Sequence, residues 1–183
     1  TDAKDKSWIY QYNQLAIQGF GVSHIPSPWI NDYASFNIMP ELDTLKIKDK
    51  LRALPFSHTN ETGKAHYYGV KLNNGIGAEI TPTAHAAIMR FTFPASSEAH
   101  LLFDTKDDCT GSVTFDSVNR VLSGYVYDPN LAWFQSIPNI YFYITCNKTI
   151  NQYGYPTKAG VCANMDFSTN ANEKVILKIG TSY

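Results

Sequence analysis

Five side chains that could together bind a sugar lie within one short segment. They are His24, Ser27, Trp29, Asn31 and Asp32. Pro26 and Pro28 fix the backbone between them and remove two hydrogen-bond donors, so this segment cannot be a central strand. An indole ring can cover the apolar C–H face of a pyranose, while hydroxyl, amide, imidazole and carboxylate groups bind its hydroxyls. The composition is therefore that of a stiff carbohydrate-binding loop on a rigid scaffold.

A purely structural role would account for the same residues. Trp29 could plug the end of a hydrophobic core, and His24 could be a satisfied, half-buried histidine. Asp32 could cap its own loop, as Asx turns do. The residues of the loop alone leave both interpretations open.

Other classes of function find no support in the sequence. It contains no Gly-x-Ser-x-Gly elbow, no phosphate-binding glycine loop and no His-Glu-x-x-His pair. The formal net charge is −1 and the basic residues are scattered, which gives no electrostatic footprint for nucleic acid or an anionic membrane. No segment approaches the roughly 18–20 apolar residues of a membrane helix. We therefore expect neither a nucleic-acid partner nor a membrane partner.

One group of acidic residues, around a predicted turn, could suggest calcium. It comprises Asp104, Asp107, Asp108 and Asp116. The spacing lacks the terminal Glu of an EF-hand, so we interpret the group as a solvated turn. His58 and Glu61 lie close in sequence, and we interpret their segment as an exposed structural loop.

The elements that must hold the loop are strands. Period-two alternation and β-branched or aromatic runs recur at short intervals, whereas helical periodicity is almost absent. The strand-like runs are residues 8–12, 16–20, 35–39, 67–72, 76–81, 87–93, 100–104, 111–116, 120–127, 140–146, 161–166 and 174–181. Asn74-Gly75 predicts a type I′ hairpin, and residues 41–51 are left irregular. The pattern predicts one all-β domain over residues 1–183, a two-sheet antiparallel β-sandwich.

The cysteines and two glycosylation sequons bear on the cellular compartment. Cys146 and Cys162 lie at the ends of a loop between predicted strands, so a disulfide is plausible, with Cys109 left over. Three reduced, buried thiols are the equal alternative. Asn60 and Asn147 begin Asn-x-Thr sequons that would accept glycans in a eukaryotic secretory pathway. The polar start of the chain implies that any export signal was removed or lies upstream.

Four motifs follow one another at close spacing. They are Phe56-Ser57-His58, Tyr67-Tyr68-Gly69-Val70, Ala78-Glu79-Ile80-Thr81 and Arg90-Phe91-Thr92-Phe93-Pro94. Their order resembles the N-terminal domain of family 92 glycosidases, which has Phe-Ser-His, Gly-Tyr-Tyr, Ala-Glu-Leu-Thr and Arg-Tyr-Thr-Phe-Pro segments. Upstream, Gly19-Phe20 to His24, Asp32-Tyr33 and Ile38-Met39-Pro40 are similar to that family's Gly-Phe-Ser-His, Asp-Tyr-Gly and Met-Pro segments. Ala34 stands where the family usually has Gly, and Lys64-Ala65-His66 stands where a Pro-Gly pair is commoner.

The resemblance implies a supersandwich-like N-terminal domain of a secreted or extracytoplasmic, Ca2+-dependent, inverting exo-α-mannosidase. In such enzymes one carboxylic acid protonates the leaving oxygen while a second carboxylate activates water. The family's acid, base and most of its calcium ligands lie in a helical toroid that this chain lacks. The resemblance thus implies no catalytic residue and no metal ligand in this segment, and an isolated chain that is inactive.

The resemblance also implies partners and site residues. The partners are a mannose-containing glycan and a catalytic helical domain or subunit. Loops of the sandwich would receive the leaving sugar, with Trp29 as the stacking platform and His24 and Asp32 as hydrogen-bond partners of its hydroxyls. A stand-alone carbohydrate-binding module is the alternative, and a domain that only braces its catalytic partner is a third possibility.

Overall fold

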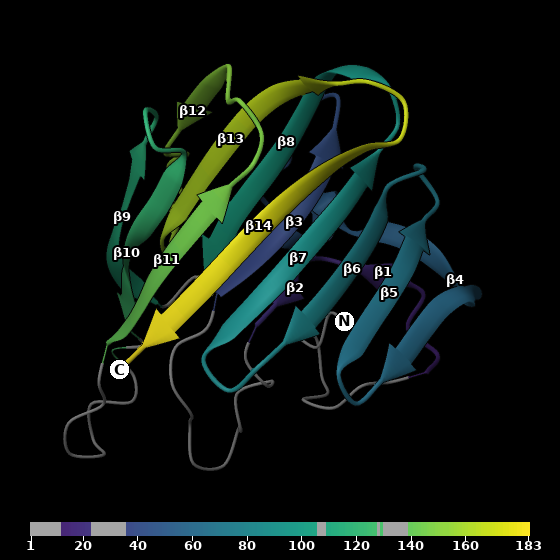
Figure 1. Cartoon of the computed structure of the whole chain (residues 1–183), viewed down its shortest axis with the longest axis horizontal. Coiled ribbons are helices and arrows are strands. Elements are labelled where there is room, and N and C mark those ends of the chain that lie inside the picture. Colours follow the sequence, from purple (N-terminus) through teal and green to yellow (C-terminus); the bar gives the residue numbers. More distant parts are fainter. Residues whose placement is uncertain (1–11, 23–35, 106–108, 128, 130–138) are drawn as a thin grey trace.

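The computed structural model describes residues 12–22, 36–105, 109–127, 129 and 139–183, and their strands form two antiparallel sheets (Figure 1). The strands are β1 (Ala16–Ile17), β2 (Phe20–Gly21), β3 (Phe36–Leu42), β4 (Leu54–Lys64), β5 (Tyr67–Leu72), β6 (Gly77–Pro82), β7 (Ala86–Phe93), β8 (Ser96–Thr105), β9 (Thr110–Asp116), β10 (Val121–Tyr127), β11 (Ile140–Cys146), β12 (Gln152–Gly154), β13 (Cys162–Thr169) and β14 (Glu173–Ser182). One short helix, α1 (Asp49–Arg52), accompanies them.

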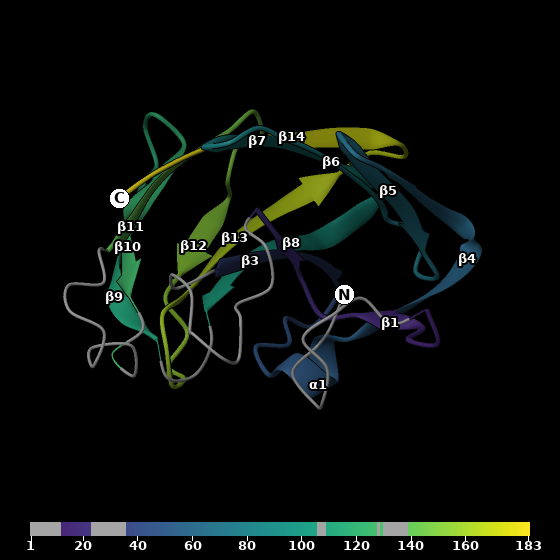
Figure 2. The same ribbon diagram turned by 90° about the horizontal axis from the view of Figure 1, so that it is seen from below.

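The larger sheet has nine strands in the order β1-β4-β5-β6-β7-β14-β11-β10-β9, and the smaller has five in the order β12-β13-β8-β3-β2. Seen from below, the two sheets form two layers with the core between them, and α1 lies on the side of β3 away from the larger sheet (Figure 2). The predicted all-β, two-sheet antiparallel sandwich is confirmed. No helix in the described part of the chain is long and apolar enough to span a membrane.

The core follows from strand alternation. In β7 the side chains of Ala87, Met89 and Phe91 are buried while Ile88 and Arg90 face outward, because successive side chains point to opposite faces of a strand. The two layers meet through aromatic rings. Phe103 of β8 lies 4.7 Å from Phe142 of β11, measured between ring centroids. These contacts rigidify the sandwich on which the loops are mounted.

Several local predictions differ from the structure. The predicted run at residues 16–20 is divided between β1 and β2, which belong to different sheets. Strands β4 and β12 were not expected, and the four-residue helix α1 lies partly in the window left irregular. The Asn74-Gly75 turn does join β5 to β6, but only Gly75 has positive φ, at 92°. A type I′ turn needs positive φ at both central residues, so that turn type is wrong. Asn74 instead accepts a hydrogen bond from the backbone N–H of Ile76 through its side-chain oxygen, at 3.2 Å.

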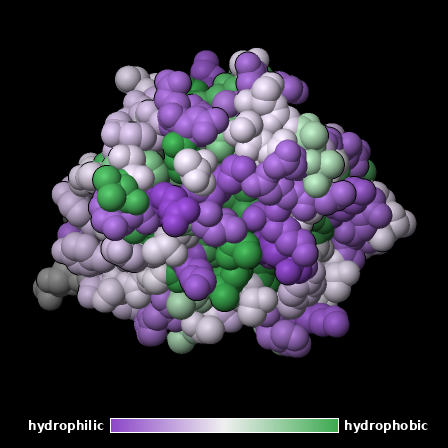
Figure 3. Space-filling view, turned by 45° about the horizontal axis from the view of Figure 1, so that its top comes forward, coloured by the Kyte–Doolittle hydropathy of each residue, from purple (hydrophilic) through white to green (hydrophobic). Residues whose placement is uncertain are grey.

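The surface is mostly hydrophilic. In Figure 3 hydrophobic atoms appear as small groups surrounded by polar ones. The outer face of the nine-stranded sheet carries several exposed apolar or aromatic side chains, among them Ile88, Tyr141 and Tyr143. Scattered exposure of this kind is ordinary for a folded domain.

Candidate functional site

The predicted site residues Trp29, His24 and Asp32 lie outside the described residues, but both ends of their segment are placed. Residues 23–35 connect β2 to β3, which pair antiparallel with Phe20 opposite Ile38 and Gly21 opposite Asn37. The segment therefore leaves and re-enters the five-stranded sheet through neighbouring strands at its edge. Its two roots, at Val22 and Phe36, are close together.

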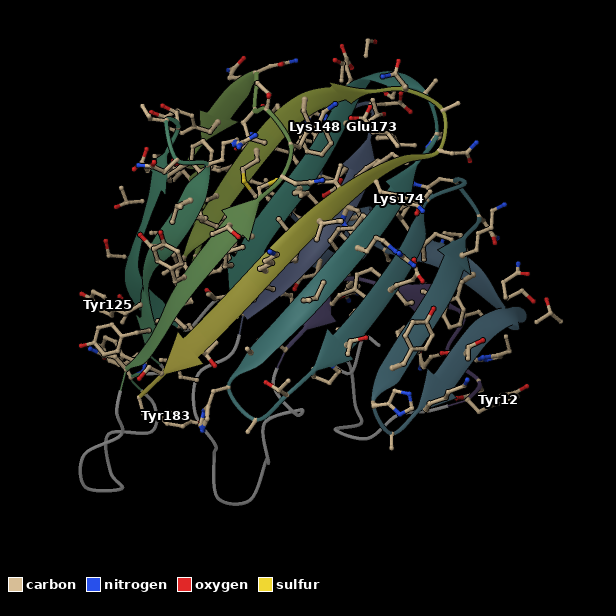
Figure 4. All side chains as sticks on the ribbon, in the orientation of Figure 1. Tyr12, Tyr125, Lys148, Glu173, Lys174 and Tyr183 are labelled. Atoms are coloured by element: carbon tan, nitrogen blue, oxygen red, sulfur yellow. The ribbon has the colours of Figure 1, made fainter. Side chains whose placement is uncertain are left out.

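Other strand ends gather at the same end of the sandwich. Phe36, where β3 begins, is opposite Thr105, where β8 ends. Tyr127 is opposite Thr110, so β10 ends where β9 begins, a few residues after β8. Figure 4 places Tyr125 and Tyr183 at this end too, whereas Tyr12 lies across the molecule beside β4 and β5. We call this the loop-bearing end, and loops mounted on one end of a sandwich commonly form binding sites.

A buried cluster of charges lies beneath the roots of residues 23–35. Arg52 of α1 is 2% exposed, and its guanidinium contacts Asp104 at 2.5 Å and Asp49 at 2.7 Å. Lys158 binds the other carboxylate oxygen of Asp104 at 2.5 Å. Asp104 is the cross-strand neighbour of both Asn37 and Cys162. We name Arg52, Asp49, Asp104 and Lys158 the Arg52 cluster.

The Arg52 cluster also binds backbone carbonyls near both roots of residues 23–35. The Nε of Arg52 donates to the carbonyl of Gln18 at 2.7 Å, just before β2. The Nζ of Lys158 donates to the carbonyl of Thr105, opposite Phe36, at 3.3 Å. Charged groups that satisfy buried carbonyls hold the backbone in one arrangement. The cluster therefore fixes where residues 23–35 leave and rejoin the sheet.

The sequence analysis did not identify Arg52, Asp49 or Lys158 as important. Arg52 and Asp49 are three residues apart on α1, which is a weak signal for an ion pair. Nothing in the local sequence connects them to Asp104, whose carboxylate comes from a distant strand. These groups meet only when β8 lies between β3 and β13 in the folded sheet.

The segment around His58 is a strand, not an exposed loop. It forms β4, and the His58 and Glu61 side chains are only 14% and 10% exposed. His58 contacts Glu61 through Nδ1 and the carbonyl of Tyr12 through Nε2, each at 2.5 Å. The ring of Tyr12 stacks on His58 at 3.9 Å, and Tyr68 donates its hydroxyl hydrogen to Glu61 at 2.7 Å. The group joins the start of the described chain to β4 and β5, which is a structural role.

The disulfide that was one of two alternatives for Cys146 and Cys162 is absent, and both residues are buried thiols. Cys146 ends β11 in the larger sheet, whereas Cys162 begins β13 in the smaller one, and a disulfide requires Cα atoms within about 7 Å of each other. Burial raises the pKa of Cys162 to about 12 and raises that of Cys146 as well. The alternative of reduced thiols describes Cys146 and Cys162 in the structure.

The two sequon asparagines have different environments. Asn60 is exposed on β4, whereas the side chain of Asn147 continues the ladder beside β14. Its oxygen accepts from the N–H of Ile176 at 2.7 Å and its nitrogen donates to the carbonyl of Lys174 at 3.2 Å. Glycosylation at either residue stays a prediction.

Replacing each asparagine by alanine should change the free energy of unfolding by different amounts, because the two environments differ. We expect Asn147→Ala to lower the free energy of unfolding by about 1–2 kcal/mol, because two backbone groups of β14 lose their partner. Asn60→Ala, the matched control, should change it by less than about 0.5 kcal/mol. Urea unfolding of unglycosylated protein measures both changes, and equal effects would contradict the proposed role of Asn147.

The acidic side chains are the residues that could bind a metal ion such as calcium. Within the described ranges, no three His, Cys, Asp or Glu side chains gather in a way that could hold a metal ion. Asp104 belongs to the Arg52 cluster. Asp116 accepts hydrogen bonds from the backbone N–H and amide of Asn119 and from the N–H of Val118, which lower its pKa. Asp107 and Asp108 lie outside the described residues. The described carboxylates do not fit a calcium site, and no step is assigned to calcium through them.

Comparison with known proteins identifies the family. The sequence profile of the Glycosyl hydrolase family 92 N-terminal domain matches residues 1–182. The chain belongs to glycosyl hydrolase family 92. This domain is also 37% identical over 54 residues to an "Uncharacterized secreted glycosidase" of Arthroderma benhamiae, a match that covers 30% of this chain and 7% of that protein.

Solved structures share the fold of the family 92 domain. A family 92 inverting mannosidase of Bacteroides thetaiotaomicron superposes with a TM-score of 0.81 at 27% identity, covering 96% of this chain and 25% of that one. A second α-mannosidase of that organism, in complex with mannoimidazole, gives a TM-score of 0.74 at 22% identity, covering 94% and 26%. The family 92 domain thus spans about a quarter of the length of these solved relatives.

Proposed function

We propose that this family 92 domain forms one wall of the active site of an exo-α-mannosidase, and that residues 23–35 contact the leaving sugar. The observation that carries the proposal is that both roots of this segment meet at the loop-bearing end and are tied to the Arg52 cluster. A ring that stacks on a sugar must be held in one position to assist catalysis. Trp29 would supply that ring, and His24 and Asp32 would bind hydroxyls.

The chemistry itself is assigned to the rest of such an enzyme. In the proposal, an (α/α) toroid completes the site and supplies the general acid and the general base of an inverting mechanism. Ca2+ would be bound mostly by that toroid and would help to hold the mannose ring, an oxygen-ligand role suited to this cation. The 27% identical solved relative is described as an inverting mannosidase, and the secreted glycosidase relative supports an extracytoplasmic location. The substrate would be a mannose-containing glycan.

The experiment compares a full-length enzyme containing this domain with its Trp29→Ala variant. We expect the variant to lose about 10- to 100-fold in kcat/KM on an α-mannoside, equivalent to about 1–3 kcal/mol. Tyr153→Ala is the matched control, because Tyr153 is exposed on β12, at the edge of the sheet opposite β2.

The isolated domain should release no mannose, and a chelator should abolish the activity of the full-length enzyme. An unchanged kcat/KM for Trp29→Ala would remove the stacking role, and activity that resists chelation would remove the calcium dependence.

A stand-alone carbohydrate-binding module is the second candidate, and one observation favours it. Tyr141 and Tyr143 of β11 are 49% and 57% exposed on the outer face of the larger sheet, with Tyr125 of β10 beside Tyr141 at 5.9 Å between ring centroids. Exposed tyrosine rings can stack on the apolar face of a sugar, and their hydroxyl groups can form hydrogen bonds with it. Binding of mannose-containing glycans by the isolated chain that is lost in Tyr141→Ala, but not in Trp29→Ala, would favour this candidate.

A further inference from the structure

Glu41 is the most unusual ionisable residue in the described part of the chain. It lies in β3 on the face of the five-stranded sheet that α1 covers, and it is 3% exposed. One carboxylate oxygen accepts a hydrogen bond from the backbone N–H of Lys46 at 2.9 Å. The other oxygen is buried and has no hydrogen-bond partner. A buried carboxylate with one oxygen unsatisfied is costly when charged.

Charged groups face Glu41 from each neighbouring element. His100 of β8 is its cross-strand neighbour. Arg52 of α1 and Lys46 of the preceding loop also interact with it electrostatically. On β13, Cys162 is close enough for Glu41 to contribute to its raised pKa. Asp166, also on β13, is the cross-strand neighbour of His100 and contacts its ring.

His100 is held between two acceptors. Its Nδ1 contacts Asp166 at 2.7 Å, and its Nε2 contacts the carbonyl of Asp43 at 2.6 Å. His100 therefore links Asp166 of β13 to the start of the segment that leads into α1.

The cations nearest to Glu41 already contact other carboxylates. Arg52 contacts Asp49 and Asp104, and His100 contacts Asp166. Lys46 is exposed, so its ammonium is solvated. An ionised Glu41 would therefore lie buried without a direct ion pair to any of these groups. Burial accordingly raises the pKa of Glu41 to about 7, against the smaller lowering effects of the Lys46 N–H, Arg52 and His100.

We propose that Glu41 holds a proton in the folded domain and makes the attachment of residues 43–52 to the five-stranded sheet sensitive to pH. The segment is attached by Glu41 at Lys46, by His100 at Asp43 and by Arg52 at Asp104. A neutral Glu41 leaves this attachment without an unpaired charge. An ionised Glu41 favours opening of the segment, because opening returns the carboxylate to water.

The direction of the pH dependence follows from the thermodynamic linkage between protonation of Glu41 and closure of residues 43–52. The pKa of Glu41 is 4.5 in an open state and about 7 in the closed state, so closure takes up a proton between these values. The stability of the closed state is full below pH 4.5 and falls as the pH rises to about 7. Because Arg52 also holds the carbonyl of Gln18, opening would also release the backbone just before β2.

The first test is direct titration of Glu41 in the 183-residue chain labelled with ¹³C at glutamate side-chain carboxyls. We expect one resonance with a midpoint near pH 7, and Glu41→Gln should remove that resonance. A midpoint near the ordinary glutamate value for this resonance would overturn the proposal. The measurement on wild-type protein does not depend on whether the variant folds.

The second test is amide hydrogen exchange of residues 43–52, corrected for intrinsic rates, between pH 4.5 and 7.5. We expect the opening equilibrium of the wild type to rise on the order of 100-fold across this range. In Glu41→Gln it should stay constant. His100→Gln, the matched control for titration of the histidine, should keep the rise. A rise that persists in Glu41→Gln, or disappears in His100→Gln, would assign the effect to another group and overturn the proposal.

Discussion

Arg52→Met is expected to lower the free energy of unfolding by about 3–5 kcal/mol. The variant would remove the guanidinium contacts to Asp49 and Asp104, and Lys158 would be the remaining cation of the Arg52 cluster beside Asp104. It would also remove the donor that satisfies the carbonyl of Gln18. Chemical denaturation at pH 7, where both carboxylates would be charged if exposed, measures the loss.

Arg90→Met is the matched control, because Arg90 forms an ion pair of similar length at the surface. Its guanidinium donates twice to Glu79, each time at 2.6 Å, and its side chain is 42% exposed. Exposed pairs contribute about 0–1 kcal/mol, since water solvates whichever partner remains. If the two arginine variants lost the same stability, burial would not be what makes the Arg52 cluster important.

The Arg52→Met variant can also show whether the Arg52 cluster affects the geometry of the site in addition to the stability of the domain. The carbonyl of Gln18 would lose its contact with Arg52, while the inter-sheet core around Phe103 would be unchanged. In a full-length enzyme we therefore expect a lower kcat/KM even under conditions where the variant is fully folded. This expectation rests on the proposed role of residues 23–35.

Several strands were predictable because they alternate between buried and outward-facing residues, as β7 and β11 do. The runs at residues 67–72 and 140–146 match β5 and β11 at both ends. Strand β4 was missed because its pairing is irregular. Phe56 is opposite Leu72 and Glu61 is opposite Val70, so five steps along β4 correspond to two along β5. A bulge of this size breaks the period-two signal on which strand prediction depends.

The family motifs proved more informative than local chemistry. Four weak motifs in order identified the family, whereas the composition of residues 23–35 was consistent with either a sugar site or a core plug. The Arg52 cluster could not be predicted, because its members meet only when β8 lies between β3 and β13 in the folded sheet. Glu41 was equally hidden, since a glutamate next to a hydrophobic run usually faces water.

Gly124→Ala is expected to lower the free energy of unfolding by at least about 3 kcal/mol, through overpacking and an unfavourable φ. Gly124 of β10 has a φ of 157°, and a Cβ there would lie 1.9 Å from the carbonyl oxygen of Ser112 on β9. The contact is with backbone, so no side-chain rotation can relieve it. The two strands would have to separate, and Tyr125 would lose its register with Ser112.

Gly63→Ala is the matched control for Gly124→Ala, because nothing lies within 4 Å of the Cβ that it would add on β4. Its effect should stay within about 0.5 kcal/mol. Since β9 and β10 both reach the loop-bearing end, hydrogen exchange of the β9 amides should also show whether strand separation is confined to that edge. A destabilisation by Gly124→Ala no larger than that of Gly63→Ala would mean that β9 can move away from β10 at little cost. The close approach of these strands would then be incidental to the fold, and the loop-bearing end would depend on the five-stranded sheet and its Arg52 cluster alone.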